Sequence, residues 1–242
     1  MHLRTSATLS ATYAGTGRCL IADEMYGEVS AWASLPTREQ LREHEMFARF
    51  SDVIAHAPIV TEPVLACFRG RNPPFGEPPR VENTPTSKEM GPPQPQNKCA
   101  GGRYNALGEA VLYLCDCEDG VARELTDQTK ALWVQAFQIL TAGVRIADFH
   151  TSSIDQSPLV SKVFWFAELA GAEGYPSTIF SQIVAEVVSS KFHGMYISGV
   201  HGDLGQHYGN VVIFKPENVW RNWLMPKSPF LLRRENRTAI VA

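Results

Sequence analysis

Apolar positions recur along the chain at two spacings, and each spacing predicts one kind of element. Between residues 176 and 190, apolar side chains return every three or four residues, which predicts an amphipathic helix. A second helix is expected to begin at Thr37, because Thr37 and Gln40 fit a capping box. This helix should end before Pro58, since proline cannot continue the backbone hydrogen bonding of a helix.

Short apolar or alternating runs predict the β-strands of the chain. They span residues 64–68, 110–114, 131–140, 144–149, 194–198 and 210–214. Because strands and helices are interspersed without regular β-α-β alternation, we expect an α+β fold with a mixed or antiparallel sheet. Residues 1–62 should form an N-terminal helical extension that packs against the main domain, which spans residues 63–242.

A proline-rich segment, residues 72–98, interrupts the predicted sheet. Proline is excluded from central strands and helix interiors, so the segment should be a surface loop of extended character. A loop of this length is typical of a lid, an interaction arm or a linker. It joins Arg69 to Arg103, and the two cations should meet at its base if both strands share a sheet.

The stretch from residue 99 to residue 125 concentrates the side chains with the most informative chemistry. Glycines lead a turn at residues 101–105, an apolar strand follows, and residues 119–125 predict a short helix. Arg103, Tyr113 and Glu124 come from the turn, the strand and the helix. An arginine suits phosphate, an aromatic face suits a flat ring, and a carboxylate suits a developing positive charge. The same residues also fit a plain hairpin with a solvated arginine, a core tyrosine and a surface glutamate.

These motifs resemble the RES domain family, which is named for its Arg, Glu and Ser. The resemblance is carried by GGRYN, VLYL and ARE, followed by YISG and GNVVIF, over about residues 64–214. Members of that family known to act on NAD+ resemble ADP-ribosyltransferases in fold, and many are toxins paired with an antitoxin. The resemblance therefore implies an ADP-ribosyltransferase-like split β-sheet around a cleft, a RES catalytic domain at residues 63–242, and NAD+ as substrate.

The resemblance also implies the residues of the site. The catalytic residues would be Glu124, Arg103, Tyr113 and Ser198. The residues that bind NAD+ would be Arg69, Arg103, Tyr104, Asn105, Tyr113, Ser198 and Asn210. In this assignment Arg103 holds phosphate with help from Arg69, and Tyr113 stacks near the nicotinamide. Glu124 would bond the nicotinamide ribose and stabilise its charge. Ser198, which matches the serine of the family name, would position the ribose or Glu124.

The implied chemistry is cleavage of the bond between nicotinamide and ribose, which expels a neutral ring and leaves an oxocarbenium-like sugar. Water as acceptor would make the protein an NAD+ glycohydrolase, and phosphate would make it a phosphorolase. Alternatives are a mono-ADP-ribosyltransferase that modifies a protein and a non-catalytic NAD-binding module. Loss of NAD+ would poison the cell, so the expected partner is an antitoxin. If the protein is instead an effector that is delivered into the cytoplasm of a target cell, the expected partner is an immunity protein.

Composition and charge limit the kinds of partner, compartment and cofactor that we expect for this protein. A net charge of -3 gives no electrostatic basis for binding nucleic acid or an anionic membrane. Five cysteines, an odd number in a chain of 242 residues, favour a reducing cytoplasm over a secreted domain held by disulfides. Cys115 and Cys117 lack a second close pair, so no metal is expected. We expect neither a membrane span nor hydride chemistry, since the chain has no long apolar run and no GxGxxG fingerprint after a strand.

Overall fold

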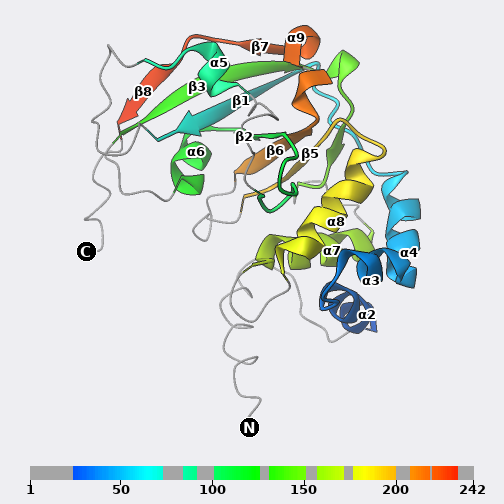
Figure 1. The fold of residues 1–242 in the computed structure, drawn as a ribbon. Coiled ribbons are helices and arrows are strands. Elements are labelled where there is room, and N and C mark those ends of the chain that lie inside the picture. Colours follow the sequence, from blue (N-terminus) through cyan, green and yellow to red (C-terminus); the bar gives the residue numbers. More distant parts are fainter. Residues whose placement is uncertain are drawn as a thin grey trace, which may run out of the picture.

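The computed structural model describes residues 24–72, 84–91, 101–125, 131–150, 157–171, 177–199, 208–218 and 220–233. In these residues, eight strands form one mixed sheet with the order β4-β5-β6-β2-β1-β3-β7, and β8 also pairs with β3. The strands β4 and β5 are parallel, whereas the other pairs of this sheet are antiparallel. The fold is therefore α+β with a mixed sheet, as the hydrophobic pattern predicts (Figure 1).

The strands lie close to the predicted runs. Their bounds are β1 (Val64–Arg71), β2 (Val111–Cys115), β3 (Ala131–Leu140), β4 (Ile146–Asp148), β5 (Gly194–Ser198), β6 (Gly209–Phe214), β7 (Leu224–Pro226) and β8 (Phe230–Arg233). The run at residues 144–149 is strand only in part, because a 3-10 turn, η4 (Thr141–Gly143), precedes it. The Val144 amide donates to the Thr141 carbonyl at 3.2 Å instead of joining the sheet. The short strands β7 and β8 are not predicted from the pattern.

Three helices of the described residues are not predicted by the pattern: Ser87–Met90, Pro158–Leu169 and Trp220–Trp223. The bounds of the helices are α2 (Glu24–Ala33), α3 (Arg38–Glu43), α4 (Glu45–Ile54), α5 (Ser87–Met90), α6 (Glu118–Glu124), α7 (Pro158–Leu169), α8 (Thr178–Ser189) and α9 (Trp220–Trp223), with a 3-10 turn η5 (Pro216–Asn218). The predicted helices at 119–125 and 176–190 correspond to α6 and α8. The buried residues of α7 lie on one side of the helix, but the apolar Trp165 and Leu169 on the other side blur this period in the sequence. Its start is nevertheless marked, since Ser157 precedes a proline at the first helical turn.

The predicted helix from Thr37 towards Pro58 is two helices. Thr37 caps α3 as expected, and its Oγ1 accepts a hydrogen bond from the Gln40 amide at 3.3 Å. His44 has an extended backbone, with φ -70 and ψ 140, and it separates α3 from α4. Its Nδ1 accepts from the Met46 amide at 3.2 Å. Because His44 caps the start of α4, the prediction of one continuous helix is wrong.

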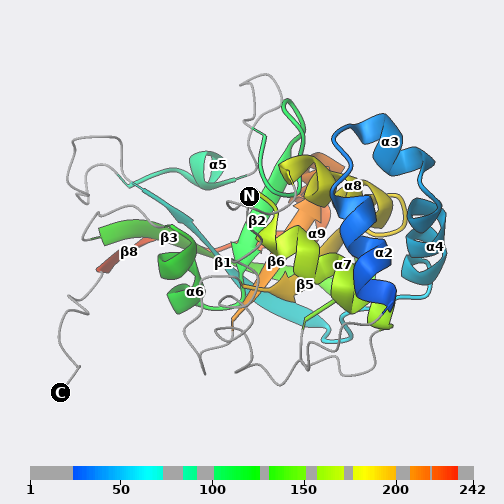
Figure 2. The same ribbon diagram turned by 90° about the horizontal axis from the view of Figure 1, so that it is seen from below.

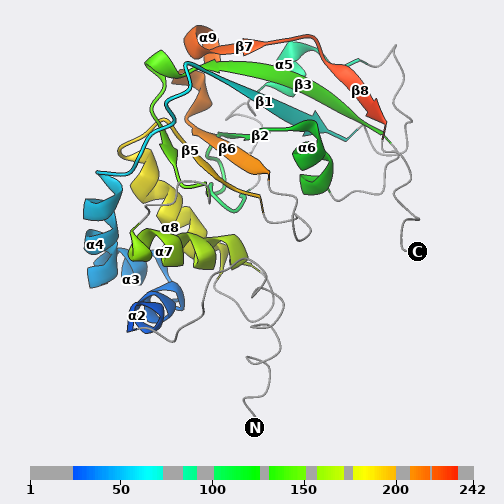
Figure 3. The ribbon, with the colours of Figure 1, turned by 180° about the vertical axis from the view of Figure 1, so that it is seen from behind.

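Helices α7 and α8 cover part of one sheet face, and α2, α3 and α4 pack outside them (Figures 1 and 2). The ring of Trp32 on α2 meets Phe180 of α8 edge-on, with centroids 5.0 Å apart. Phe50 of α4 lies 6.3 Å from Phe164 of α7, and all of these rings are buried. The segment from α2 to α4 therefore shares one hydrophobic core with the helices of the main domain. Figure 3 shows the same grouping from behind.

Strand alternation divides β2 between the two faces of the sheet. Val111 belongs to the core beneath α7 and α8, and Cys115 belongs to a smaller core that includes residues of α6. Tyr113 lies between them on the same face and is 39% exposed. Leu112 and Leu114 point to the opposite face, into a third core. The exposed ring of Tyr113 thus lies between two packed regions of one sheet face.

The sheet consists of two well-paired parts that meet at one point. Strand β2 pairs with β6 over five registered pairs, and β1 pairs with β3 over eight. Between β1 and β2, by contrast, the register in the described residues gives one partner pair, Phe68 with Cys115. The part containing β4, β5, β6 and β2 therefore joins the part containing β1, β3, β7 and β8 through a short contact.

The proline-rich segment contains one element in its described part. Residues 84–91 include the helical turn α5, and the rest of residues 73–98 lies outside the described residues. A capping box forms this turn: Glu89 accepts from the Thr86 amide at 2.7 Å, and the Glu89 amide donates to Thr86 Oγ1 at 3.3 Å. The prediction of extended structure is wrong at this point, because the prolines leave room for one capped turn. No helix in the described residues is long and apolar enough to cross a membrane.

Candidate functional site

The turn at residues 101–105 is fixed by Asn105 and Tyr113. The Gly102 amide donates to the Asn105 carbonyl at 2.9 Å, which closes the turn. The Asn105 side chain donates from Nδ2 to the Glu109 carbonyl at 3.1 Å and accepts at Oδ1 from the Tyr113 hydroxyl at 2.9 Å. That hydroxyl also accepts from the Tyr104 amide at 3.0 Å. The predicted binding residues Tyr104, Asn105 and Tyr113 are therefore brought together.

The ring of Tyr113 is open to a ligand, whereas its hydroxyl is occupied by hydrogen bonds within the turn. Burial of the hydroxyl within the turn raises the pKa of Tyr113 to about 12, while part of the ring stays exposed. The phenol therefore stays protonated and acts as a donor to Asn105. An exposed aromatic face on a fixed side chain is suited to packing against a flat ring.

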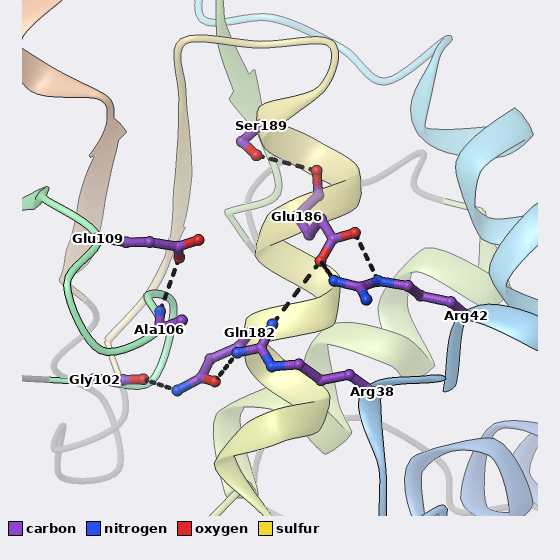
Figure 4. A network of polar contacts seen from close by, with 8 residues as sticks. All are labelled: Arg38, Arg42, Gly102, Ala106, Glu109, Gln182, Glu186 and Ser189. Atoms are coloured by element: carbon purple, nitrogen blue, oxygen red, sulfur yellow. Dashed lines mark hydrogen bonds and ion pairs between the residues drawn. The ribbon is translucent and has the colours of Figure 1, made fainter. Parts of the chain in front are cut away.

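Helix α8 holds the same turn from the other side (Figure 4). Gln182 donates from Nε2 to the Gly102 carbonyl at 2.9 Å. The Ser181 hydroxyl, which is buried, donates to the Arg103 carbonyl. Successive residues of α8 thus bind successive carbonyls of the turn, and the backbone that carries the half-buried Arg103 side chain is anchored from two directions.

Glu124 lies in the last turn of α6, opposite the start of β6. Its Oε1 accepts hydrogen bonds from the Tyr208 hydroxyl at 2.7 Å and from Asn210 Nδ2 at 2.6 Å. Cys117 caps the start of this helix, its Sγ accepting from the Gly120 amide at 3.3 Å. The structure therefore brings together Glu124 and Asn210, two residues that the sequence assigns to the site.

Cys115 orients the amide of Asn210. The two residues are paired across β2 and β6, and the Cys115 thiol donates to Asn210 Oδ1 at 3.1 Å. Burial raises the pKa of Cys115, so the thiol keeps the proton that it donates. Because Oδ1 faces the thiol, Nδ2 must face Glu124. The sequence raised Cys115 only as a possible metal ligand, and its pairing with Asn210 becomes visible only once the strand register is known.

Asp116 fixes the segment that carries Tyr208 and Asn210. Its Oδ2 accepts from the Gly209 amide at 2.8 Å and from the Tyr196 hydroxyl at 2.8 Å. The Asp116 amide in turn donates to the Gly209 carbonyl at 2.9 Å. Sequence reasoning missed both Asp116 and Tyr208. The only local signal for Tyr208 is its place directly before the GNVVIF motif.

The phenol of Tyr104 in the turn is buried near several charged side chains. Burial raises the pKa of this phenol, and the negative charge of Glu168 on α7 acts in the same direction. The charges of Arg103 and Glu124 also act on this phenol, Arg103 in the opposite direction. Tyr104 is 3% exposed, and within the described part of the chain its hydroxyl has no hydrogen-bond partner. Among the described residues, this buried hydroxyl thus has no hydrogen-bond partner, although its ring is affected by the charges of Arg103, Glu124 and Glu168.

Arg69 points to the other face of the sheet. A Cβ on its neighbour Gly70 would meet Val121 and Leu125 near α6, so Arg69 faces away from that helix. Its Nη1 donates to the Met90 carbonyl at 3.1 Å and to the Gly91 carbonyl. Burial, with the nearby charge of Arg71, lowers the pKa of Arg69 to about 10. Strands β1 and β2 do share one sheet, but Arg69 points away from the face that carries α6 and Glu124.

Ser198 also lies apart from the Glu124 group. It ends β5, where it is paired with Gly209, while Asn210 is paired with Ile197. By alternation, Ser198 shares the face of Tyr196, whereas Asn210 points to the opposite face with Ile197. By strand direction, Arg69 and Ser198 thus lie on the sheet face opposite to Asn210, and their part in the site stays a prediction.

The arrangement offers an oriented carboxylate and a partly exposed aromatic ring on one face of the sheet, next to a turn whose anchored backbone carries Arg103. In the described residues, no group of three or more His, Cys, Asp or Glu side chains is placed to hold a metal ion. A comparison with protein-family models found no match, and a search of curated proteins found no significant match.

Proposed function

We propose that this protein degrades NAD+ by cleaving the bond between nicotinamide and its ribose, as a glycohydrolase or a phosphorolase. The observation that carries the proposal is the Glu124 carboxylate, which Tyr208 and Asn210 hold at 2.7 and 2.6 Å. Both donors are neutral, so they orient the carboxylate without cancelling its charge. A fixed negative charge stabilises a cation that develops in a transition state.

The proposed reaction begins when the electron pair of the C1′–N bond leaves with nicotinamide, which departs as a neutral ring. The ribose becomes an oxocarbenium-like cation, as in glycoside hydrolysis. Glu124 stabilises this cation. Water then adds to C1′ and releases its proton to solvent, or inorganic phosphate adds in its place. No strong acid is needed, because the leaving ring requires no proton.

The turn at residues 101–105 binds the rest of the dinucleotide in this proposal. Arg103 pairs with the diphosphate through charge-assisted hydrogen bonds, and the ring of Tyr113 packs against the nicotinamide. The bonds from Ser181 and Gln182 support these roles, because they hold the backbone of the turn before substrate arrives. Such preorganisation lowers the entropy cost of binding.

The two-part sheet supports an ADP-ribosyltransferase-like fold in this proposal. Its parts meet at the pair of Phe68 with Cys115, and Cys115 lies beside Asn210 at the site. A substrate placed where two sheet parts diverge contacts the turn before β2 and the helix after it. These are the elements that carry Arg103 and Glu124.

The proposal is tested by incubating the purified protein with NAD+, with and without phosphate and with and without cell lysate, and resolving the products by chromatography. A glycohydrolase releases nicotinamide and free ADP-ribose, and a phosphorolase yields a phosphorylated ADP-ribose only when phosphate is present. If the NAD+ carries a label in its ADP-ribose part, transfer of that label to a protein of the lysate would support a mono-ADP-ribosyltransferase instead. A melting temperature raised by NAD+ without any product would indicate a binding module and contradict the proposed reaction.

An enzyme of this kind harms the cell that contains it, so we also propose a cytoplasmic toxin with a neutralising antitoxin or immunity protein. Expression in a bacterial cytoplasm should lower cellular NAD+ and stop growth, and Glu124→Gln should restore both. Growth arrest that persists with Glu124→Gln would show that NAD+ loss is not the cause.

Tyr104→Phe should stabilise the protein and weaken its binding of NAD+. The change removes a buried hydroxyl that has no hydrogen-bond partner in the described part of the chain, so the free energy of unfolding in urea should rise by about 1 kcal/mol. If this hydroxyl bonds the substrate, the same variant should bind NAD+ about tenfold more weakly, because that bond is lost. Calorimetric titration with NAD+ measures the second effect.

Tyr208→Phe is the matched control for Tyr104→Phe. It deletes the same atom from another buried tyrosine, but here the hydroxyl donates to Glu124 at 2.7 Å. Loss of a hydrogen bond to a charged group should lower the free energy of unfolding by about 1.5 to 3 kcal/mol. Equal stability changes in the two variants would contradict the difference in their hydrogen bonding.

A further inference from the structure

A chain of side-chain contacts links the N-terminal helices to the turn of the candidate site (Figure 4). Arg38, the first residue of α3, donates from Nη2 to Gln182 Oε1 on α8. Gln182 donates from Nε2 to the Gly102 carbonyl at 2.9 Å. Residues far apart in the sequence thus form a direct path from the N-terminal segment to the residue before Arg103.

Arg38 decides which way the Gln182 amide faces. A side-chain amide has a donor end and an acceptor end, whereas a guanidinium can only donate. Arg38 must therefore face Oε1, which turns Nε2 towards the Gly102 carbonyl. Without this guanidinium, the amide could rotate and present Oε1 to the carbonyl, and the two oxygens would repel each other.

A second contact between α3 and α8 does not involve Gln182. Arg42 donates from Nε and Nη2 to the Glu186 carboxylate at 3.0 and 2.8 Å. Both side chains are about two fifths exposed, at 42% and 40%. Glu186 also lies 3.9 Å from Arg38 Nη1, so both arginines of α3 meet α8. The two arginines differ in that only Arg38 contacts Gln182.

We propose that Arg38 is a positioning residue for the turn that carries Arg103, and that it acts through Gln182. The N-terminal helices then do more than cover the core: one of their side chains sets the hydrogen bonding of the site. The effect on the turn does not depend on the ligand. Only its consequence for NAD+ rests on the function proposed above.

Hydrogen exchange at the amides of Gly102 and Tyr104 measures the proposed effect directly, because both amides are bonded within the turn. Arg38→Ala should raise their exchange rates about tenfold, since the Gln182 bond loses its orientation. Gln182→Glu should do the same although it keeps the partner of Arg38, because a carboxylate has no donor for the Gly102 carbonyl. Arg42→Ala should leave both rates unchanged, although it removes the larger ion pair between α3 and α8.

Two results would overturn the proposal. One is an increase of exchange in Arg42→Ala as large as that in Arg38→Ala, which would mean that any loosening of α3 disturbs the turn. The other is normal exchange in Gln182→Glu, which would show that the bond to Gly102 does not hold it. The effect on substrate is read separately, as an increase of about tenfold in the Kd for NAD+ in Arg38→Ala and Gln182→Glu but not in Arg42→Ala. Altered exchange without any NAD+ binding would support the positioning role and contradict the proposed function.

Discussion

Glu124→Gln should lower the rate of NAD+ cleavage by on the order of a hundredfold or more and leave the fold intact. The carboxamide keeps an oxygen that can accept from Tyr208 and Asn210, so both hydrogen bonds survive the change. It removes the negative charge that stabilises the oxocarbenium-like ribose. The loss should therefore appear in kcat, with little change in the Kd for NAD+. Single-turnover cleavage followed by chromatography measures the rate.

Glu118→Gln is the control for this variant. It removes the same charge from the first turn of the same helix, where Glu118 lies among the acidic residues that begin α6. Its rate of cleavage should stay close to that of the unchanged protein. If Glu124→Gln cleaves NAD+ at the original rate while its circular dichroism is unaltered, Glu124 does not stabilise the cation and the proposed mechanism fails.

Gly102→Ala should disrupt the turn of the candidate site and destabilise the protein. A Cβ at this position would lie 2.6 Å from Asn105 Oδ1 and 3.1 Å from the Tyr113 hydroxyl, the two atoms whose bond fixes the turn. The side chains must therefore separate or the backbone must shift. We expect the free energy of unfolding in urea to fall by about 1 to 3 kcal/mol, as for other overpacked sites. Binding of NAD+ should weaken as well, since Arg103 is the next residue.

Gly101→Ala provides a matched comparison one residue earlier. The nearest atom to a Cβ there is the Leu107 nitrogen at 3.4 Å, which is an ordinary contact, and Gly101 is exposed. This variant should keep both its stability and its binding. A loss of stability in Gly101→Ala equal to that in Gly102→Ala would mean that the turn needs flexible glycines in general, and not the space that Gly102 leaves.

Much of the local structure can be predicted from the sequence, because its causes lie within a few residues. The capping box at Thr37 and the apolar period of α8 each specify their element directly. Local sequence patterns also explain why the break between α3 and α4, and the whole of α7, are not predicted. The cap at His44 looks like an interior residue of an apolar helix, and Trp165 and Leu169 blur the period of α7 because they add apolar residues to its less buried side.

The candidate site is predicted less completely, because its geometry depends on strand register and direction. Glu124 and Asn210 are both named by the sequence, but their contact requires β2 and β6 to pair Cys115 with Asn210. Tyr208 has no pattern that singles it out before that pairing is known. Arg69 is a sound candidate by residue type, yet alternation along β1 turns it towards α5 and away from Glu124.

The sequence by itself determined the α+β class, the positions of most strands and helices, and a glycine turn followed by an arginine, a tyrosine and a glutamate. Only the tertiary structure decided which of these side chains share a face, and that Cys115, Asp116, Gln182 and Tyr208 hold them in place. The physical reason is the range of the interactions. Caps, turns and apolar periods depend on a few neighbouring residues. The face on which a strand residue lies depends instead on pairing between distant segments, and it alternates from one residue to the next.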